Sequence, residues 1–154
     1  IVESQGIPFY YIPANKEIRE HVEEQQMKLL HEHNVDLIVL ARYMQILTPN
    51  FVEAFKHQII NIHHSFLPAF IGAKPYERAY DRGVKLIGAT SHYVTDDLDE
   101  GPIIEQDISR VDHRDNVEAM KKIGQSIERS VLARAVKWHL EDRIIVYGNK
   151  TIVF

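Results

Sequence analysis

One heptapeptide narrows the folds open to this chain more than any other feature. Residues 35–41 read Val-Asp-Leu-Ile-Val-Leu-Ala, an almost continuous apolar run. A run of this kind fits a strand that is buried on both faces of a parallel sheet. Helices are predicted on either side of it, at residues 15–33 and at residues 48–56, which open on a Thr-Pro pair typical of a helix start. A buried strand between two helices predicts an α/β layer fold.

The rest of the chain continues this alternation. Further strands are predicted at residues 7–12, 58–62, 84–95 and 102–108, further helices at 76–82 and 115–141 (capped by Asp115), and a terminal hairpin at 144–154. The acidic connection 96–101 is typical of a hairpin, which makes the sheet mixed at one edge. We expect one domain over residues 1–154 with a mixed, mostly parallel sheet flanked by helices, in which 35–41 and 58–62 are parallel neighbours.

Composition removes several classes of function. The 154 residues carry a net charge of −4, so a broad electrostatic surface for nucleic acid is not expected. The absence of cysteine excludes disulfides, thiol nucleophiles and thiolate metal sites. No apolar run approaches the roughly 20 residues of a membrane-spanning helix, and the first residues do not form a signal peptide. We therefore expect a soluble protein without a membrane partner.

Unusual polar residues gather where the predicted strands end, which is where ligands bind in open α/β sheets. Asn61 and His63 are two residues apart at the end of strand 58–62, so their side chains face the same way. An Asn amide can donate to a developing oxyanion, and a His can shuttle a proton near neutral pH. Asp99, in the acidic connection, is the best candidate for orienting the His or activating water. These residues predict hydrolysis or group transfer.

Other interpretations of the same residues stay open. Asn61 can be a turn residue, the acidic connection a solvated loop, and His92 either a buried core histidine or a partner of Asp99. The pair His63-His64 raises the question of a metal. Neighbouring positions on a strand point to opposite faces, and the spacing matches no strong metal signature, so we expect no metal site.

Three segments resemble the folate-dependent formyltransferase superfamily. Residues 61–68, Asn-Ile-His-His-Ser-Phe-Leu-Pro, resemble its Asn-x-His-x-Ser-x-Leu-Pro segment. Residues 92–104 resemble the motif that carries its catalytic Asp, and residues 39–47 look like the strand and loop lining its folate pocket. His64 stands where the transferases usually have Pro. With His64 at this position, and with residues 70–76 and 146–151, the chain is most similar to the formyltetrahydrofolate deformylase family.

The resemblance implies a Rossmann-like formyltransferase fold and a cytoplasmic hydrolase that converts 10-formyltetrahydrofolate to formate and tetrahydrofolate. That reaction supplies formate to purine biosynthesis and balances one-carbon pools. Asn61, His63 and Asp99 are then the catalytic residues. The resemblance implies a substrate site formed by Met44, Gln45, Ile46, Leu47, His64, Thr95, Asp96 and Leu98. The folate is the substrate, no cofactor is implied, and a homo-oligomer is left open.

The resemblance also has limits and rivals. The deformylase family carries an N-terminal ACT domain and an opening strand and loop that nothing here matches, and residues 1–5 resemble the end of a helix closed by Gly6. We therefore expect a chain truncated at its N-terminus. The rival functions are formyl transfer to glycinamide ribonucleotide or to aminoacylated tRNA, a folate-binding module without turnover, and an unrelated metal hydrolase.

His64 and the loop that follows it are expected to decide why water is the acceptor. Bulky groups in this stretch (Phe66, Phe70, Ile71 and Tyr76) would narrow the approach of an amine, while a water molecule still fits. The alternative is that His64 only hydrogen-bonds its own loop.

Overall fold

The computed structural model describes residues 2–13, 18–41, 43, 45–64, 74–96 and 100–154. Its four-stranded sheet has the order β1-β2-β3-β4, formed by β1 (Ile38–Leu40), β2 (Ile59–His63), β3 (Leu86–Tyr93) and β4 (Ile103–Arg110). The strands β1 and β2 are parallel, as expected for the segments that contain them, while the β2–β3 and β3–β4 pairs are antiparallel. The expected α/β class with a mixed sheet flanked by helices is confirmed.

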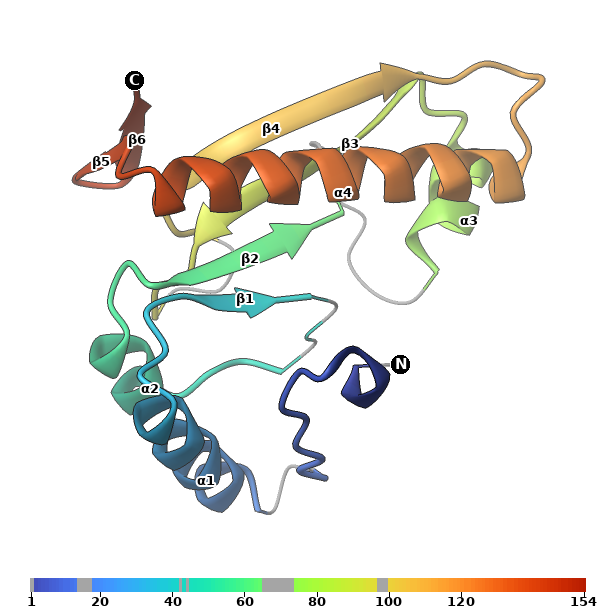
Figure 1. The fold of residues 1–154 in the computed structure, drawn as a ribbon. Helices are drawn as coiled ribbons and strands as arrows, with labels where there is room; N and C mark the ends of the chain where they lie inside the picture. The colour runs from blue at the N-terminus through green and yellow to red at the C-terminus, as the bar shows by residue number, and fades with distance from the viewer. Residues whose placement is uncertain (1, 14–17, 42, 44, 65–73, 97–99) are drawn as a thin grey trace.

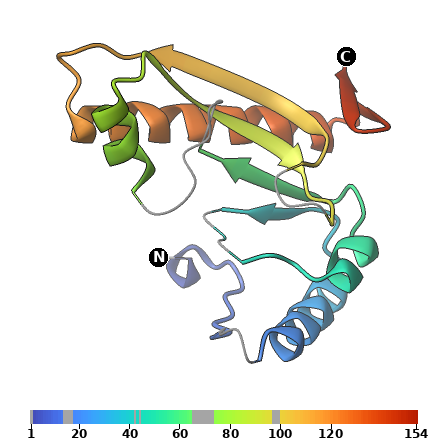
Figure 2. The same cartoon turned by 180° about the vertical axis from the view of Figure 1, so that it is seen from behind.

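Helices lie on both faces of this sheet. The long helix α4 (Val117–Leu140) runs along one face of β2, β3 and β4, and α3 (Pro75–Arg82) packs beside its first turns (Figure 1). The helices α1 (Arg19–Glu32) and α2 (Pro49–Ala54) lie together at the opposite side of β1 and β2, as the view from behind also shows (Figure 2). No helix among the described residues is long and apolar enough to cross a membrane.

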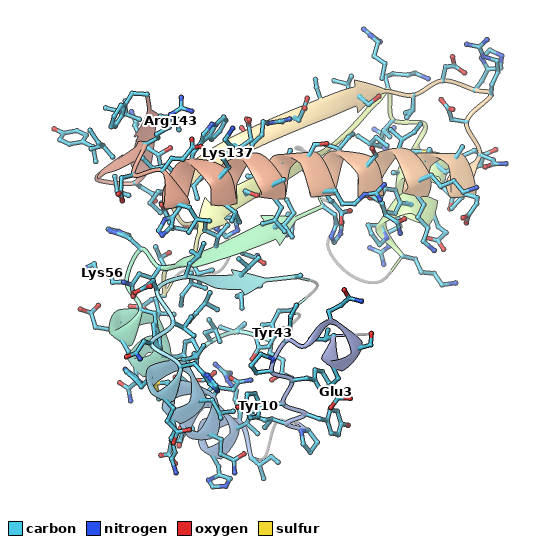
Figure 3. The ribbon with its side chains drawn as sticks, viewed as in Figure 1. Glu3, Tyr10, Tyr43, Lys56, Lys137 and Arg143 are labelled. Atoms are coloured by element: carbon cyan, nitrogen blue, oxygen red, sulfur yellow. The ribbon has the colours of Figure 1, made fainter. Side chains whose placement is uncertain are left out.

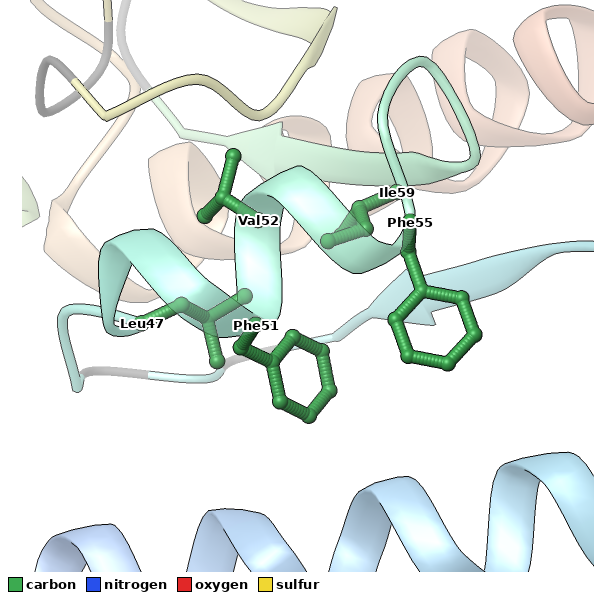
Figure 4. Close-up of a cluster of buried hydrophobic side chains, with 5 residues drawn as sticks. All are labelled: Leu47, Phe51, Val52, Phe55 and Ile59. Carbon is green, nitrogen blue, oxygen red and sulfur yellow. The ribbon is translucent and has the colours of Figure 1, made fainter.

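The central strand β2 is buried on both faces. Its first two residues, Ile59 and Ile60, have no exposed surface, and because side chains alternate along a strand they enter two different cores. Ile59 joins a cluster with α2, shown in Figure 4, that contains Leu47, Phe51, Val52 and Phe55. Ile60 joins Tyr93, Ile104 and Ala135 on the α4 side. This double burial holds the end of β2 in place.

The C-terminal end of the chain forms a hairpin, whereas the N-terminal end forms a single helical turn. The expected terminal hairpin is present as β5 (Ile144–Tyr147) and β6 (Lys150–Val153), with Gly148 in the left-handed conformation at its turn. Its residues fasten the chain near the acidic connection, because Asn149 Nδ2 donates to the Glu100 carbonyl at 2.9 Å and Thr151 Oγ1 to the Ile103 carbonyl at 2.6 Å. At the other end, the single 3₁₀ turn η1 (Glu3–Gln5) ends at Gly6 with φ +71°, as expected.

Three sequence predictions are wrong in detail. Residues 7–12 form no strand, because no described strand lies beside them to supply hydrogen-bond partners, and Tyr11 is 80% exposed. The apolar run 35–41 forms a strand only at Ile38–Leu40, and Val39 is 40% exposed, because β1 is the edge of the described sheet. The helix α4 is capped by Asn116, not Asp115: Asn116 Oδ1 accepts from the Ala119 N–H at 2.9 Å.

Candidate active site

A cavity of about 760 Å³ opens where β1, β2 and β3 meet the helices. Among the predicted catalytic and substrate-binding residues, eight line it: Gln45, Ile46, Leu47, Asn61, His63, His64, Thr95 and Asp96. The other three, Met44, Leu98 and Asp99, lie outside the described residues. Segments separated by up to about fifty positions in the sequence therefore meet at one cavity, and its size suits a drug-sized organic ligand.

Asn61 is held by a histidine on the neighbouring strand. The β2–β3 register pairs Asn61 with His92, and the Asn61 Nδ2 lies 3.5 Å from the His92 Nε2. The His92 Nδ1 lies 2.9 Å from the Tyr93 carbonyl oxygen, which can only accept. In the neutral form of the ring, Nδ1 carries the proton and Nε2 accepts from the amide of Asn61. His92 is thus a buried histidine that orients Asn61; its expected link to Asp99 lies outside the described residues.

A close backbone approach supports this arrangement. The chain returns from the acidic connection so near to β3 that a Cβ on Gly101 would lie 1.8 Å from the Tyr93 carbonyl oxygen. Only glycine fits there. The Tyr93 N–H also donates to the Pro102 carbonyl at 3.0 Å, so the chain that leaves the acidic connection is fixed next to His92 and Asn61.

His63 and His64 do not point to opposite faces, which corrects the argument from strand alternation. β2 ends at His63, so His64 is free of the strand geometry, and the two rings stack with centroids 5.2 Å apart. The ring of His64 lies 6.5 Å from that of Tyr76. Across the described part of the chain, no group of three or more His, Asp and Glu side chains is arranged to hold a metal ion.

The sequence analysis missed one wall of the cavity except for Tyr76, which it expected among the bulky groups that narrow the approach of an amine. This wall is formed by the first turn of α3 and by the polar side of the N-terminal half of α4, through Lys74, Tyr76, Glu77, Val117, Glu118, Lys121, Gln125 and Glu128. The sequence pattern shows that α4 has an apolar stripe, but not which ligand-sized space its polar side faces. On the opposite wall, burial and the nearby Glu23 carboxylate raise the pKa of Tyr43, so this side chain remains a neutral phenol.

Ligands bind at the strand ends of open α/β sheets. Here the end of β2 presents an amide and an imidazole to the cavity, which is the arrangement of an enzyme active site. The model of the formyl transferase family matches residues 2–136, and the chain belongs to that family.

Individual relatives sharpen the comparison. The chain is 75% identical, over its whole length, to the formyltetrahydrofolate deformylase of Bacillus subtilis (strain 168), of which it covers 51%. It matches the crystal structure of a formyltetrahydrofolate deformylase from Pseudomonas syringae with a TM-score of 0.92 at 55% identity, over 99% of this chain and 51% of that one. Glycinamide ribonucleotide transformylase 1 from Symbiobacterium toebii matches with a TM-score of 0.87 at 32% identity, over 99% and 73%. The chain spans about half the length of the deformylases it matches.

Proposed function

We propose that this chain carries the catalytic domain of an enzyme that hydrolyses 10-formyltetrahydrofolate to formate and tetrahydrofolate. One observation carries the proposal: Asn61 and His63, from the end of a doubly buried strand, line the same cavity in a chain that is 75% identical to a formyltetrahydrofolate deformylase. The formyl group on nitrogen is an amide-like carbonyl, and the two side chains suit the charge changes of its hydrolysis.

Asn61 is the proposed oxyanion donor. When water adds to the formyl carbon, the carbonyl oxygen gains negative charge and needs a hydrogen-bond donor that is already in position. The hydrogen bond to His92 orients the amide so that the remaining N–H of Nδ2 can serve that oxygen. A well-placed donor of this kind contributes on the order of 3 kcal/mol to transition-state stabilisation.

His63 and Asp99 are the proposed proton carriers. The attacking water must lose a proton and the leaving folate nitrogen must gain one, so the two transfers balance. Asp99 would hold and deprotonate the water, while His63 would deliver a proton to the nitrogen as the carbon–nitrogen bond breaks. The place of Asp99 stays a prediction from its motif.

The folate is proposed to lie against the wall formed by Gln45, Ile46 and Leu47, with polar contacts from Thr95 and Asp96. A flat heterocycle needs an apolar slot with few polar partners, and these residues supply both. The reduced folate is then the substrate, and we propose no separate cofactor, no metal and no nucleic acid as partner.

A formyltransferase is the second candidate, because the glycinamide ribonucleotide transformylase from Symbiobacterium toebii shares the fold at 32% identity. The two functions differ in the acceptor. The test supplies 10-formyltetrahydrofolate with and without glycinamide ribonucleotide and measures formate and formylated product. Formate release that does not depend on an added amine supports the hydrolase, while release only of formylated amine supports the transferase.

The proposed roles are tested by substitution. His63→Ala and Asn61→Ala are each expected to lower the turnover number by about 100-fold or more, while the dissociation constant for the folate changes little. The exposed His113→Ala serves as the control and is expected to keep full activity. Equal loss of folate binding and turnover in both variants would contradict catalytic roles. Loss of activity on adding a chelator would instead favour a metal hydrolase.

A further inference from the structure

A tyrosine in the wall of the cavity connects α3 to α4. Tyr76 lies in the first turn of α3, and its hydroxyl donates to the Glu128 Oε1 on α4 at 2.9 Å. Both side chains line the cavity that also contains Asn61 and His63. The carboxylate of Glu128, the polar group that α4 offers at this point, is therefore engaged by the protein itself.

The sequence of α4 makes room for this tyrosine. Gly124 precedes Glu128 by one helical turn and is buried. A Cβ at Gly124 would lie 2.0 Å from the Tyr76 hydroxyl oxygen and 2.6 Å from two carbons of its ring. Glycine inside a helix costs roughly 0.5–1 kcal/mol relative to alanine, and the gain here is the space in which the ring lies. Gly124 and Glu128 thus form a seat that holds Tyr76 by shape and by a hydrogen bond.

The held ring continues a line of ring side chains. The ring of Tyr76 lies 6.5 Å from His64, and His64 stacks on His63 with centroids 5.2 Å apart. A wall of three rings, here called the ring wall (His63, His64 and Tyr76), therefore extends from the end of β2 to α4. A second reactant that approaches His63 from the side of α4 would meet the rings of Tyr76 and His64 first.

We infer that Tyr76 is a specificity-determining residue that closes the acceptor side of the cavity, with Gly124 and Glu128 as its positioning residues. The inference rests on the proposed hydrolysis and adds the physical cause of its selectivity. A water molecule needs little space to reach the formyl carbon, whereas an amine must carry its substituents past the ring wall. Tyr76 also occupies Glu128, which would otherwise be a hydrogen-bond partner for a polar acceptor.

The two outcomes differ in a simple atom balance. In hydrolysis the water oxygen bonds to the formyl carbon, the bond from carbon to the folate nitrogen breaks, and that nitrogen takes one proton of the water. The second proton is released as formic acid ionises, so formate and tetrahydrofolate leave. In transfer the amine nitrogen takes the place of the water oxygen, and an N-formyl amine leaves with tetrahydrofolate. The ratio of N-formyl amine to formate therefore reports access to the cavity.

The experiment measures this ratio in the purified, full-length protein, with 10-formyltetrahydrofolate and either hydroxylamine or glycinamide as the added nucleophile. Tyr76→Ala is expected to raise the ratio for glycinamide about tenfold or more, with a smaller change for hydroxylamine, because discrimination by pocket size has that magnitude. Tyr80→Ala is the matched control, because Tyr80 lies on the same helix and is 48% exposed. It is expected to leave the ratio unchanged.

Variants of the seat guard against a folding artefact. Gly124→Ala displaces the ring while keeping all its atoms, and is expected to raise the glycinamide ratio in the same direction as Tyr76→Ala. Glu128→Gln keeps an oxygen acceptor for the hydroxyl, so its ratio is expected to stay close to that of the unsubstituted protein. Glu128→Ala is expected to give an intermediate ratio, like that of Tyr76→Phe.

Two outcomes would contradict these proposals in different ways. If the protein releases formate and no Tyr76 or Gly124 variant changes the ratio, the inference is overturned while the proposed function stands. No formate release by the unsubstituted protein would count against the proposed function, and the inference would fall with it.

Discussion

The inner sheet, meaning β2, β3 and the helix α4 that covers them, differs sharply from the N-terminal region, meaning residues 2–13 and 18–41. In the inner sheet, Ile60, Val131 and Ala135 have no exposed surface. In the N-terminal region, Phe9 is 52% exposed, and only Val22 and Glu23 of α1 are buried. The proposed catalytic pair, Asn61 and His63, lies in the inner sheet. Side chains that need an exact geometry are therefore placed where close packing fixes the backbone.

Polar contacts add to the packing of Met27, Leu30, Ile38 and Leu40 against the cluster around α2 in holding the N-terminal region. The Tyr10 hydroxyl bonds to the His33 Nε2 at 2.7 Å, on the side of the molecule shown with Tyr10 and Tyr43 in Figure 3. The buried Glu23 carboxylate accepts from the Thr48 N–H at 3.1 Å and from its hydroxyl, which ties α1 to the start of α2. Leu47 stands just before that start, so this tie also supports the proposed folate wall.

The largest expected effect is a cavity in the inner sheet. Ile60→Ala is expected to lower the free energy of unfolding by about 3 kcal/mol, because it removes buried methyl groups and leaves a void between the sheet and α4. Val39→Ala, on the exposed edge strand, is expected to cost less than about 1 kcal/mol. Urea denaturation of the two variants measures both, and equal losses would remove the contrast between the regions.

The next effect should be confined to the N-terminal region. Glu23→Ala is expected to cost about 2 kcal/mol, because it leaves the Thr48 donors without their buried acceptor. Hydrogen exchange should quicken in α1 and at the start of α2, and stay unchanged in α4. Exchange that quickens throughout the chain would show that the two regions unfold as one unit. The exposed Glu24→Ala, on the same helix, is the control.

A smaller effect depends on pH and lies at the far end of α4. The Tyr93 hydroxyl and the His139 Nδ1 form a hydrogen bond of 2.7 Å; burial raises the pKa of Tyr93 to about 12 and lowers the pKa of His139. Since the folded-state pKa of His139 lies below its unfolded value of about 6.5, the unfolded chain binds the proton first, and stability falls as the pH drops through that window. His139→Gln is expected to flatten the fall of the melting temperature between pH 7 and about pH 5. His113→Gln, at an exposed site, should leave the slope as it is.

The smallest effect has the opposite sign. The Ser91 hydroxyl on β3 is fully buried and has no hydrogen-bond partner among the residues that the structure describes. Ser91→Ala is therefore expected to leave stability unchanged or to raise it by up to about 1 kcal/mol. Thermal unfolding measures it, and a clear loss of stability would mean that a partner of the hydroxyl exists.

The site was predictable from local patterns only in part. The two-residue spacing of Asn61 and His63 indicates a shared direction on any strand, and the structure places both at one cavity. The partner of Asn61 was not predictable, because the register between β2 and β3 decides that His92 stands opposite it. Nor was the stack of His63 on His64, since it depends on the residue at which the strand ends.

By itself, the sequence determined the elements whose signals are local. The Thr48-Pro49 start of α2, the turn at Gly148 and the apolar stripe of α4 depend on near neighbours in the chain, so they were predictable. Only the tertiary structure decided which apolar segments became buried strands, because a strand needs a partner. Ile59 and Ile60 have a strand on each side, and residues 7–12 have none in the part of the chain that the structure describes. It also decided that Gly124 lies under Tyr76, since contacts between distant segments arise only when the helices pack.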